Sequence, residues 1–435
     1  MGDEVSDIIP SGSRAGSDAR HEAEHANIAD MLGLLHQKGH ICNVKNTEFA
    51  GGARGDGTTD DTAAIHAAIQ AAQGFPNGGI VEFPYGVYAT SAPLVSASND
   101  IWFIGPHGLK ATMGGAGNDN DSSATIRPLS TWARGSANQP AAILVDAVAA
   151  GRKLSRGGIV NICVDGGNLP QSTLMHGIAT YGYVGAWTLH DFIVASIANA
   201  RSVGVNQVTD ATGERPQGNS ITRGLVQATM GGGVILAAGD ATIEHIHTQS
   251  TGGNGISITG RGGDTRLSHC RGDLAARNGF DINVPCGQYL GMVQLSNCST
   301  QRNGNNGINI SNSAADRISV VYCTGCVFQG DGTSGSPGSG IRLSGPVGAV
   351  FTGCGVHVNS GIPADSSGTW PTYAITTAAD NVAPPVFADI HGGFYNAATA
   401  FSNKIDAPLL SVVDALEYHG GQWLPTATPT HITAL

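Results

Sequence analysis

Two aspartates, Asp240 and Asp264, lie at equal distances ahead of two histidines. Asp240 lies five residues before His245 in "GDATIEH", and Asp264 lies five residues before His269 in "GDTRLSH". If the chain repeats with this spacing, the two carboxylates lie one repeat apart, which is about 5 Å for stacked strands. Retaining glycosidases place two carboxyl groups about 5 to 5.5 Å apart. The pair therefore predicts an acid and a nucleophile for glycoside cleavage, although Gly-Asp is also a common turn dipeptide.

Further polar side chains are expected around this pair. Glu214 lies on the long loop 206–219 of the preceding repeat, and Asp281 lies on an outward strand position. The predicted catalytic carboxylates are therefore Asp240, Asp264, Glu214 and Asp281. The predicted substrate contacts are Arg342, Asn309, Arg261 and Trp370. Trp370 could stack on a sugar ring or simply anchor its loop.

The repeat that must position these residues is a glycine followed by an apolar-x-apolar phrase. It recurs at intervals of 27, 29, 22, 24, 28 and 33 residues, at Gly177, Gly204, Gly233, Gly255, Gly279, Gly307 and Gly340. Periods in this range indicate stacked structural units. The short alternating runs within each unit favour strands over helix pairs.

A second phrase ends in cysteine, and its copies at Cys270, Cys298, Cys326 and Cys354 are each 28 residues apart. These thiols are predicted to be buried, reduced and stacked, with Ile246 and Ile390 continuing the stack. Residues that tolerate a left-handed backbone recur beside this phrase. The predicted corners are Asn161, Asp191, Gly224, His245, His269, Asn297, Gly325, Gly353, Asp389 and Asp414. A zinc half-site at Cys323-x-x-Cys326 is the alternative, but no second CxxC pair exists.

Together these patterns predict an all-β fold. Residues 78–425 are expected to form a right-handed parallel β-helix of about ten or more rungs, followed by a C-terminal tail over 426–435. Residues 44–77 are expected to cap its first rung, because an open sheet edge invites aggregation. The stretch "DDTAAIHAAIQAAQ" has a helical apolar stripe, with Asp60 as the N-cap and Asp61 at the positive helix end.

This capping segment carries a family resemblance. "GARGDGTTDDTAAIHAAIQAA" followed by "GGIVEFPYGVYATSAPLV" resembles the N-terminal cap and first rung of the pectate-lyase-like β-helix superfamily, and within it the bacteriophage tailspike and minor tail protein branch. The resemblance implies glycan binding, often with cleavage by hydrolysis or β-elimination, and a homotrimer. The pectin hydrolase motifs are missing apart from His176-Gly177, which makes pectin hydrolysis doubtful.

Residues 1–43 are predicted to be a helical stem. Within 17–38, Ile28, Met31, Leu32 and Leu35 form an apolar stripe that could pack on copies of itself or on other virion tail or baseplate proteins. His21 and His25 match H-E-x-x-H, but too few residues precede them to form a metalloprotease domain. A metal ion held by these histidines on a three-fold axis is the remaining alternative.

Charge and composition restrict the function. The net charge of −11, without a Lys/Arg cluster, argues against nucleic acid, and no apolar run is long enough to insert into a membrane. Single cysteines and the lack of a signal peptide favour folding in a host cytoplasm. We expect a virion tail protein that binds and depolymerises a host surface polysaccharide without a cofactor. The alternatives are a secreted bacterial lyase or hydrolase and a non-catalytic adhesive β-helix.

Overall fold

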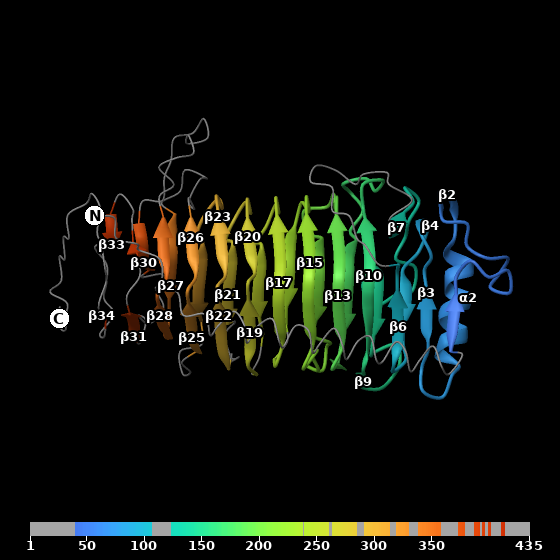
Figure 1. Cartoon of the computed structure of the whole chain (residues 1–435), viewed down its shortest axis with the longest axis horizontal. Coiled ribbons are helices and arrows are strands. Elements are labelled where there is room, and N and C mark those ends of the chain that lie inside the picture. The colour runs from blue at the N-terminus through green and yellow to red at the C-terminus, as the bar shows by residue number, and fades with distance from the viewer. Residues whose placement is uncertain are drawn as a thin grey trace, which may run out of the picture.

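The computed structural model describes residues 40–106, 123–237, 239–260, 263–284, 291–313, 319–329, 338–357, 373–378, 387–391, 394–395, 399–401 and 410–413. These residues form a row of parallel strands stacked along one axis, from the N-terminal end in blue to the C-terminal end in red (Figure 1). Residues 1–39 of the predicted stem, Arg261, Trp370, Asp414 and the C-terminal tail lie outside the described residues, whereas Ile41–Asn43, predicted as part of the stem, form a strand of the β-helix.

Two long parallel ladders make the body. One side of the first ladder comprises β1 (Ile41–Asn43), β3 (Ile80–Glu82), β6 (Ile101–Ile104), β10 (Gly157–Asp165), β13 (Thr188–Ala195), β15 (Ser220–Gln227), β17 (Thr242–Gln249), β19 (Thr265–Ser268), β22 (Met292–Ser296), β25 (Ser319–Thr324), β28 (Val347–Thr352), β31 (Phe387–His391) and β34 (Leu410–Val413). Beyond a corner it continues in β2 (Asp56–Asp60), β4 (Gly86–Thr90), β7 (Ala124–Pro128), β20 (Arg271–Asp273), β23 (Ser299–Gln301), β26 (Val327–Gln329), β29 (Gly355–His357) and β32 (Phe394–Tyr395). Strands β10, β13, β15 and β17 run through the corner and serve both sides.

The second ladder comprises β5 (Leu94–Ser96), β8 (Ala141–Asp146), β11 (His176–Tyr181), β14 (Val203–Val208), β16 (Gly232–Leu236), β18 (Ile256–Thr259), β21 (Phe280–Val284), β24 (Ile308–Asn312), β27 (Ser339–Ser344), β30 (Tyr373–Ala378) and β33 (Thr399–Phe401). A minor pair, β9 (Leu154–Ser155) with β12 (Val184–Gly185), joins two neighbouring rungs where the chain passes from the second ladder to the first. The predicted right-handed parallel β-helix is confirmed.

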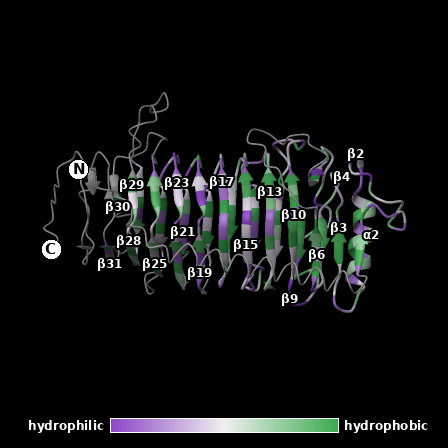
Figure 2. Cartoon of the chain, in the orientation of Figure 1, coloured by the Kyte–Doolittle hydropathy of each residue, from purple (hydrophilic) through white to green (hydrophobic). Residues whose placement is uncertain are grey.

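The core lies inside the coil. Hydrophobic positions alternate with hydrophilic ones along the strands, so every second side chain faces this core (Figure 2). The predicted cysteine stack is confirmed, because Cys270, Cys298, Cys326 and Cys354 are all buried and free. Each thiol donates to a carbonyl of the preceding rung, as from Cys298 Sγ to Leu267 O at 3.7 Å. Ile246 extends this stack, but Ile390 was wrongly assigned to it. Ile390 pairs with Phe351 and continues the neighbouring ladder.

The first corner has the predicted left-handed backbone. φ is positive at Asn161, Asp191, His245, His269, Asn297, Gly325 and Gly353. The corner prediction for Asp389 was wrong, and Gly224 lies beside its corner instead of at it. Arg223, with φ 52°, forms the corner of its rung, whereas Gly224 is aligned with Phe192 and faces the core. Asp389 lies within β31 and pairs with Val350, which is three residues before the Gly353 corner, so Asp389 is a strand residue.

Helix α2 (Thr62–Gln73) covers the first rung by packing against β1, β3 and β5. Asp61, not Asp60, occupies its N-cap position. The Asp61 carboxylate accepts the N–H groups of Arg54 and Gly55 at 2.7 and 3.0 Å, and Asp60 accepts that of Thr62 at 3.0 Å. These acidic residues therefore order the turn that starts the helix.

Candidate functional site

Asp240 and Asp264 lie at equivalent positions of neighbouring rungs and are exposed, as their spacing predicts. Asp240 Oδ1 accepts the backbone N–H of Asp264 at 3.0 Å, and Asp264 Oδ1 accepts that of Met292 at 3.2 Å. Each carboxylate thus links its turn to the next rung. This geometry favours a structural role, and catalysis by this pair stays a prediction.

Glu214 lies on the loop before β15. An isolated bridge from Gln217 to Gly239 brings this loop beside the turn of Asp240. The Glu214 carboxylate is paired with Lys153 Nζ at 3.0 Å, and both side chains are largely exposed. The Lys153 ammonium also lies 4.5 Å from the ring centre of Tyr183. Glu214 therefore has a cationic partner of its own.

Asp281 lies on the other ladder, in register with Asn309 and Arg342 as predicted. Its carboxylate accepts the side-chain amides of Asn309, Asn278 and Asn254 at 2.8, 3.0 and 3.0 Å. Burial raises the pKa of Asp281, and the amides and nearby arginines oppose this shift. The structure thus joins three of the predicted residues, Asp281, Asn309 and Arg342, and separates them from Asp240 and Asp264.

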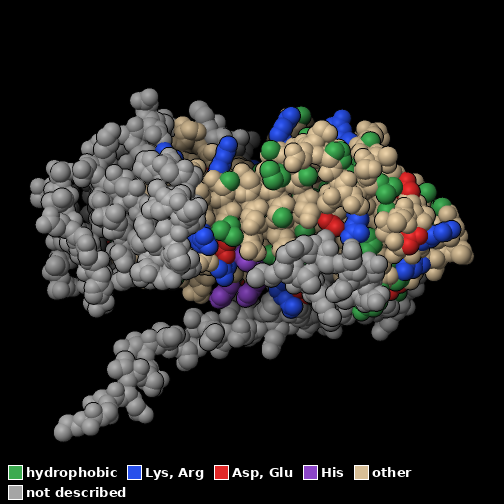
Figure 3. Space-filling model, turned by 90° about the horizontal axis from the view of Figure 1, so that it is seen from above, with side chains coloured by type: hydrophobic (Ala, Val, Ile, Leu, Met, Phe, Trp, Pro, Cys, Tyr) green, Lys and Arg blue, Asp and Glu red, His purple; other side chains and the backbone are tan. Residues whose placement is uncertain are grey.

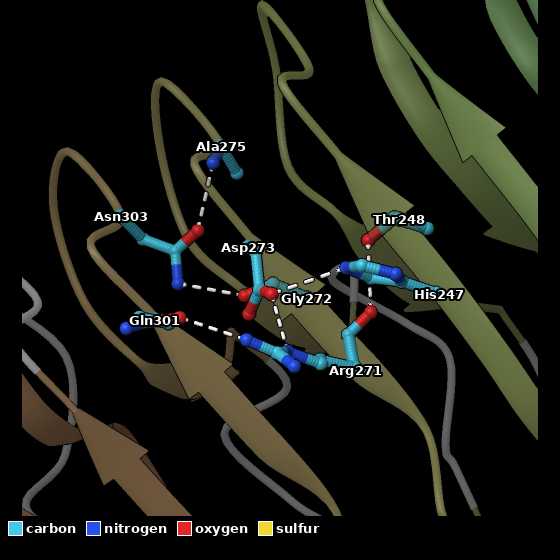
Figure 4. A network of polar contacts seen from close by, with 8 residues as sticks. All are labelled: His247, Thr248, Arg271, Gly272, Asp273, Ala275, Gln301 and Asn303. Carbon is cyan, nitrogen blue, oxygen red and sulfur yellow. Dashed lines mark hydrogen bonds and ion pairs between the residues drawn. The ribbon is translucent and has the colours of Figure 1, made fainter. Parts of the chain in front are cut away.

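A third group, which the sequence prediction missed, lies beyond the first corner and is shown in Figure 4. His247 Nε2 lies 3.1 Å from Asp273 Oδ2, and Arg271 Nε forms an ion pair with the same oxygen. Arg271 also donates to Gln301 Oε1 at 2.7 Å. We call His247, Arg271 and Asp273 the His247–Asp273 cluster.

Burial distinguishes the members of the His247–Asp273 cluster. The Asp273 side chain is 6% exposed, whereas those of His247 and Arg271 are 32% and 47% exposed. Asp273 Oδ1 is buried and has no hydrogen-bond partner among the described residues. A buried carboxylate oxygen without a partner is costly and needs an explanation, which an ordered internal water would supply.

The register explains how the His247–Asp273 cluster forms. Positions equivalent to Asp273 are occupied by glutamine in the two rungs on either side, namely Gln227, Gln249, Gln301 and Gln329, and the row continues as Ala195 and Asp165 at one end and His357 at the other. Each of these residues lies four positions after its first-corner residue. The acid at 273, between glutamines in the two rungs on either side, was therefore visible in the sequence once the corners were aligned, although Asp165 is a second acid in the same row.

Two further histidines lie at the corner beside the His247–Asp273 cluster. The rings of His245 and His269 stack in adjacent rungs, with centroids 4.9 Å apart and planes at 3°. Figure 3 shows histidine side chains gathered next to basic and acidic ones on this face. An imidazole held by a buried carboxylate can transfer a proton, and a guanidinium beside it can stabilise negative charge. The arrangement therefore suits acid–base cleavage of a polar substrate.

Other kinds of site find less support among the described residues. No group of three or more His, Cys, Asp or Glu side chains in this part of the chain could hold a metal ion. No helix that the structure describes is long and apolar enough to cross a membrane.

The stacked rungs and the polar outer face define a parallel β-helix protein of the pectate-lyase-like class. Residues 42–280 match the family model described as rhamnogalacturonase A/epimerase, pectate lyase-like. The chain belongs to this family. A search of curated protein sequences gave no match.

Solved structures share the fold at low sequence identity. The A-module of mannuronan C-5 epimerase AlgE4 from Azotobacter vinelandii is 16% identical with a TM-score of 0.56, over 85% of this chain and 99% of that one. The enzymatically active domain of bacteriophage CBA120 tailspike protein 2 is 15% identical with a TM-score of 0.57, over 85% and 53%. The pre-mature gene product 12 of bacteriophage phi29 is 14% identical with a TM-score of 0.58, over 89% and 54%. The chain thus spans about half the length of these two phage proteins.

Proposed function

We propose that this protein is a component of a phage tail that binds and depolymerises a host surface polysaccharide. The observation that carries the proposal is the His247–Asp273 cluster, in which an accessible imidazole and guanidinium share one oxygen of a buried carboxylate. The family and the likeness to a phage tailspike domain support the same role.

The face around the His247–Asp273 cluster suits a polymer with many hydroxyl groups. Gln249 and Gln301 flank Asp273 in neighbouring rungs, so polar groups recur about every 4.8 Å along the axis, with an amide on each side of the carboxylate. Amides both donate and accept hydrogen bonds, as sugar hydroxyls do. We therefore place a glycan along the axis across β17, β20 and β23, with the bond to be cleaved beside His247.

Substitution of the competing acids tests this assignment. Asp273→Asn keeps the shape of the side chain but removes the charge that orients His247, so cleavage should fall by about 10²-fold or more. Asp264→Asn is the matched control at an exposed turn, and cleavage should change little. The measurement is mass spectrometry of oligosaccharides released from capsules of candidate host bacteria. Loss of cleavage in Asp264→Asn, with full activity in Asp273→Asn, would instead make Asp240 and Asp264 the catalytic pair.

The same products discriminate between the remaining functions. Hydrolysis adds one water to each cleaved bond, whereas β-elimination leaves an unsaturated sugar end of lower mass. Saturable binding without released product would support the adhesive alternative. Cleavage restricted to plant or algal glycans would support a secreted bacterial enzyme.

The homotrimer and the attachment to other tail proteins through residues 1–43 are also part of this proposal. Light scattering of the full-length protein should give the mass of a trimer. A monomeric mass would contradict the assembly but leave the glycan site untouched.

A further inference from the structure

An apolar cluster lies outside the coil at its N-terminal end. Ile80, Trp102 and Val160 are 1%, 4% and 3% exposed and form a cluster separate from the core. Their chain neighbours Val81, Phe103 and Ile159 belong to the core inside the coil. Because side chains alternate along a strand, the first three must face outward. With Ile41 and Ile104, which pack on them, they form what we call the outer apolar patch.

The outer apolar patch is continuous across four strands. Ile41, Ile80 and Trp102 are in register on β1, β3 and β6, and Ile104 is in register with Val160 on β10. The row of Trp102 continues as Gly158 on β10 and, in later rungs, as Thr188, Ser220, Thr242 and Arg266, so its apolar character ends with this patch. Ile41 and Ile104 lie in the same sheet, beside the buried three and not above them. Outward apolar side chains this deeply buried require a cover.

We propose that residues 17–38 of the same chain dock on the outer apolar patch as an amphipathic helix. The sequence predicts a helix there, with Ile28, Met31, Leu32 and Leu35 on one face. This segment ends three residues before Ile41, which is itself part of the patch. The occupant is therefore tethered at the edge of its docking surface, which makes docking within one chain effectively favoured over docking between chains.

The dimensions agree with this assignment. Three rung spacings make the patch about 14 Å long. The stripe from Ile28 to Leu35 extends about 10 Å along a helix. Leu35 packs toward β1 and β3, and Ile28 toward β10, so the helix runs against the direction in which the rungs are added. The polar face of the helix then remains outward and available to a tail partner. This extends the proposed function, because the apolar stripe binds the β-helix of its own chain and only the polar face is left for attachment.

Proteolysis of the full-length protein tests docking. The double variant L32E/L35E places charge in the stripe, and A26E/Q37E places the same charge on the opposite helix face. Residues 17–38 should resist brief trypsin treatment in the wild type and in A26E/Q37E, and be cleaved at least tenfold faster in L32E/L35E. Ile104→Glu, a patch substitution on a partly buried residue, should give the same loss of protection. Rapid cleavage in the wild type would overturn the proposal.

Cross-linking shows whether the helix covers the outer apolar patch of its own chain or that of a neighbouring copy. L32C/I104C should form a disulfide on mild oxidation, and a mixture of isotope-labelled and unlabelled chains should give cross-linked peptides of uniform label only. Peptide pairs of mixed label would show docking on a neighbouring copy, and absence of the cross-link would place the helix elsewhere. Either result overturns the proposal. Glycan cleavage is measured on the same samples, so failure here is distinguishable from failure of the proposed function.

Discussion

His176 is a buried residue whose role the structure makes clear. Its side chain is 7% exposed, and its Nδ1 accepts the backbone N–H of Val203 at 3.0 Å. Burial lowers the pKa of His176 to about 4. The His-Gly dipeptide that resembled a pectin hydrolase motif therefore satisfies a backbone group of the next rung.

His176 should make stability depend on pH. Its folded pKa lies below the unfolded value of about 6.5, so the unfolded chain binds more protons between these values. The free energy of unfolding should be constant above about pH 6.5 and fall as the pH drops toward 4, by about 3 kcal/mol from this residue. Urea denaturation at several pH values measures this loss. His176→Asn retains an acceptor and should remove that part of the slope, and an unchanged slope would contradict the assignment.

The four stacked cysteines should be chemically inert in the folded protein. Burial raises the pKa of Cys298 well above its usual range, and the hydrogen bond with Cys326, followed by burial, raises that of Cys354. Since the thiolate is the reactive form, iodoacetamide should not modify these residues until the protein unfolds. Peptide mass spectrometry with and without denaturant provides the measurement. Modification of Cys298 under native conditions would show that the rungs open readily.

At the scale of elements, Gly224 shows how neighbouring rungs share core volume. A Cβ at this position would lie 2.1 Å from Cζ of Phe192 in the preceding rung. The phenyl ring thus fills the space that a side chain of residue 224 would need. Gly224→Ala should lower the free energy of unfolding by about 1–3 kcal/mol through overpacking. Thermal unfolding followed by circular dichroism measures the change.

A double-mutant cycle provides the control for Gly224. Phe192→Leu leaves space beside Gly224, so the methyl group of Gly224→Ala should cost less in that background. The expected coupling is about 1 kcal/mol or more, because the two side chains are in direct contact. Additive effects would mean that the ring moves aside at no cost.

The corners show how far the sequence predicts this fold. Asn, Asp, His and Gly mark the first corner because these residues tolerate a left-handed backbone. The second corner is also left-handed, but it is formed by Ser196, Ala228, Ser250, Leu274 and Arg302, whose types give no such signal. Hydrogen bonds between rungs, such as Leu274 N to Gln301 O at 2.9 Å, hold these residues in that conformation. Tertiary contacts there override local preference, so only the structure reveals this corner.

The candidate site was predictable to a similar degree. Periodicity correctly placed Asp240 and Asp264 one rung apart, but it does not say whether a carboxylate meets a substrate or a backbone N–H. The His247–Asp273 cluster depends on side chains two and four positions after a corner, on adjacent rungs. Recognising it requires the exact register of the strands and the burial of Asp273. The recurring sequence phrases give neither of these.

At the scale of the whole molecule, the rungs from β19 to β28 repeat without a register shift. Thr265 pairs with Val293, Val293 with Val321, and Val321 with Ala349, each 28 residues further along the chain. Removal of residues 292–319 would therefore join Gly291 to Val320 and let Val321 take the place of Val293. We expect this shortened protein to fold with its core ladders intact.

A deletion one residue shorter is the matched control. Removal of residues 292–318 would shift the following strand by one position and turn its apolar side chains outward. Circular dichroism and thermal unfolding should show a cooperative β-protein for the first deletion and loss of cooperativity for the second. Equal behaviour of the two would show that the rungs are not held by side-chain register.

This exact spacing also bears on how such genes change length. Neighbouring turns place the same kinds of residue at the same positions, so unequal recombination between their coding segments can add or remove a complete turn in frame. Each such event would preserve the cap and the rungs before the change while altering how far the C-terminal end of the rod lies from the cap. The reach of the molecule could therefore evolve in steps of one turn, separately from the residues that contact its ligand.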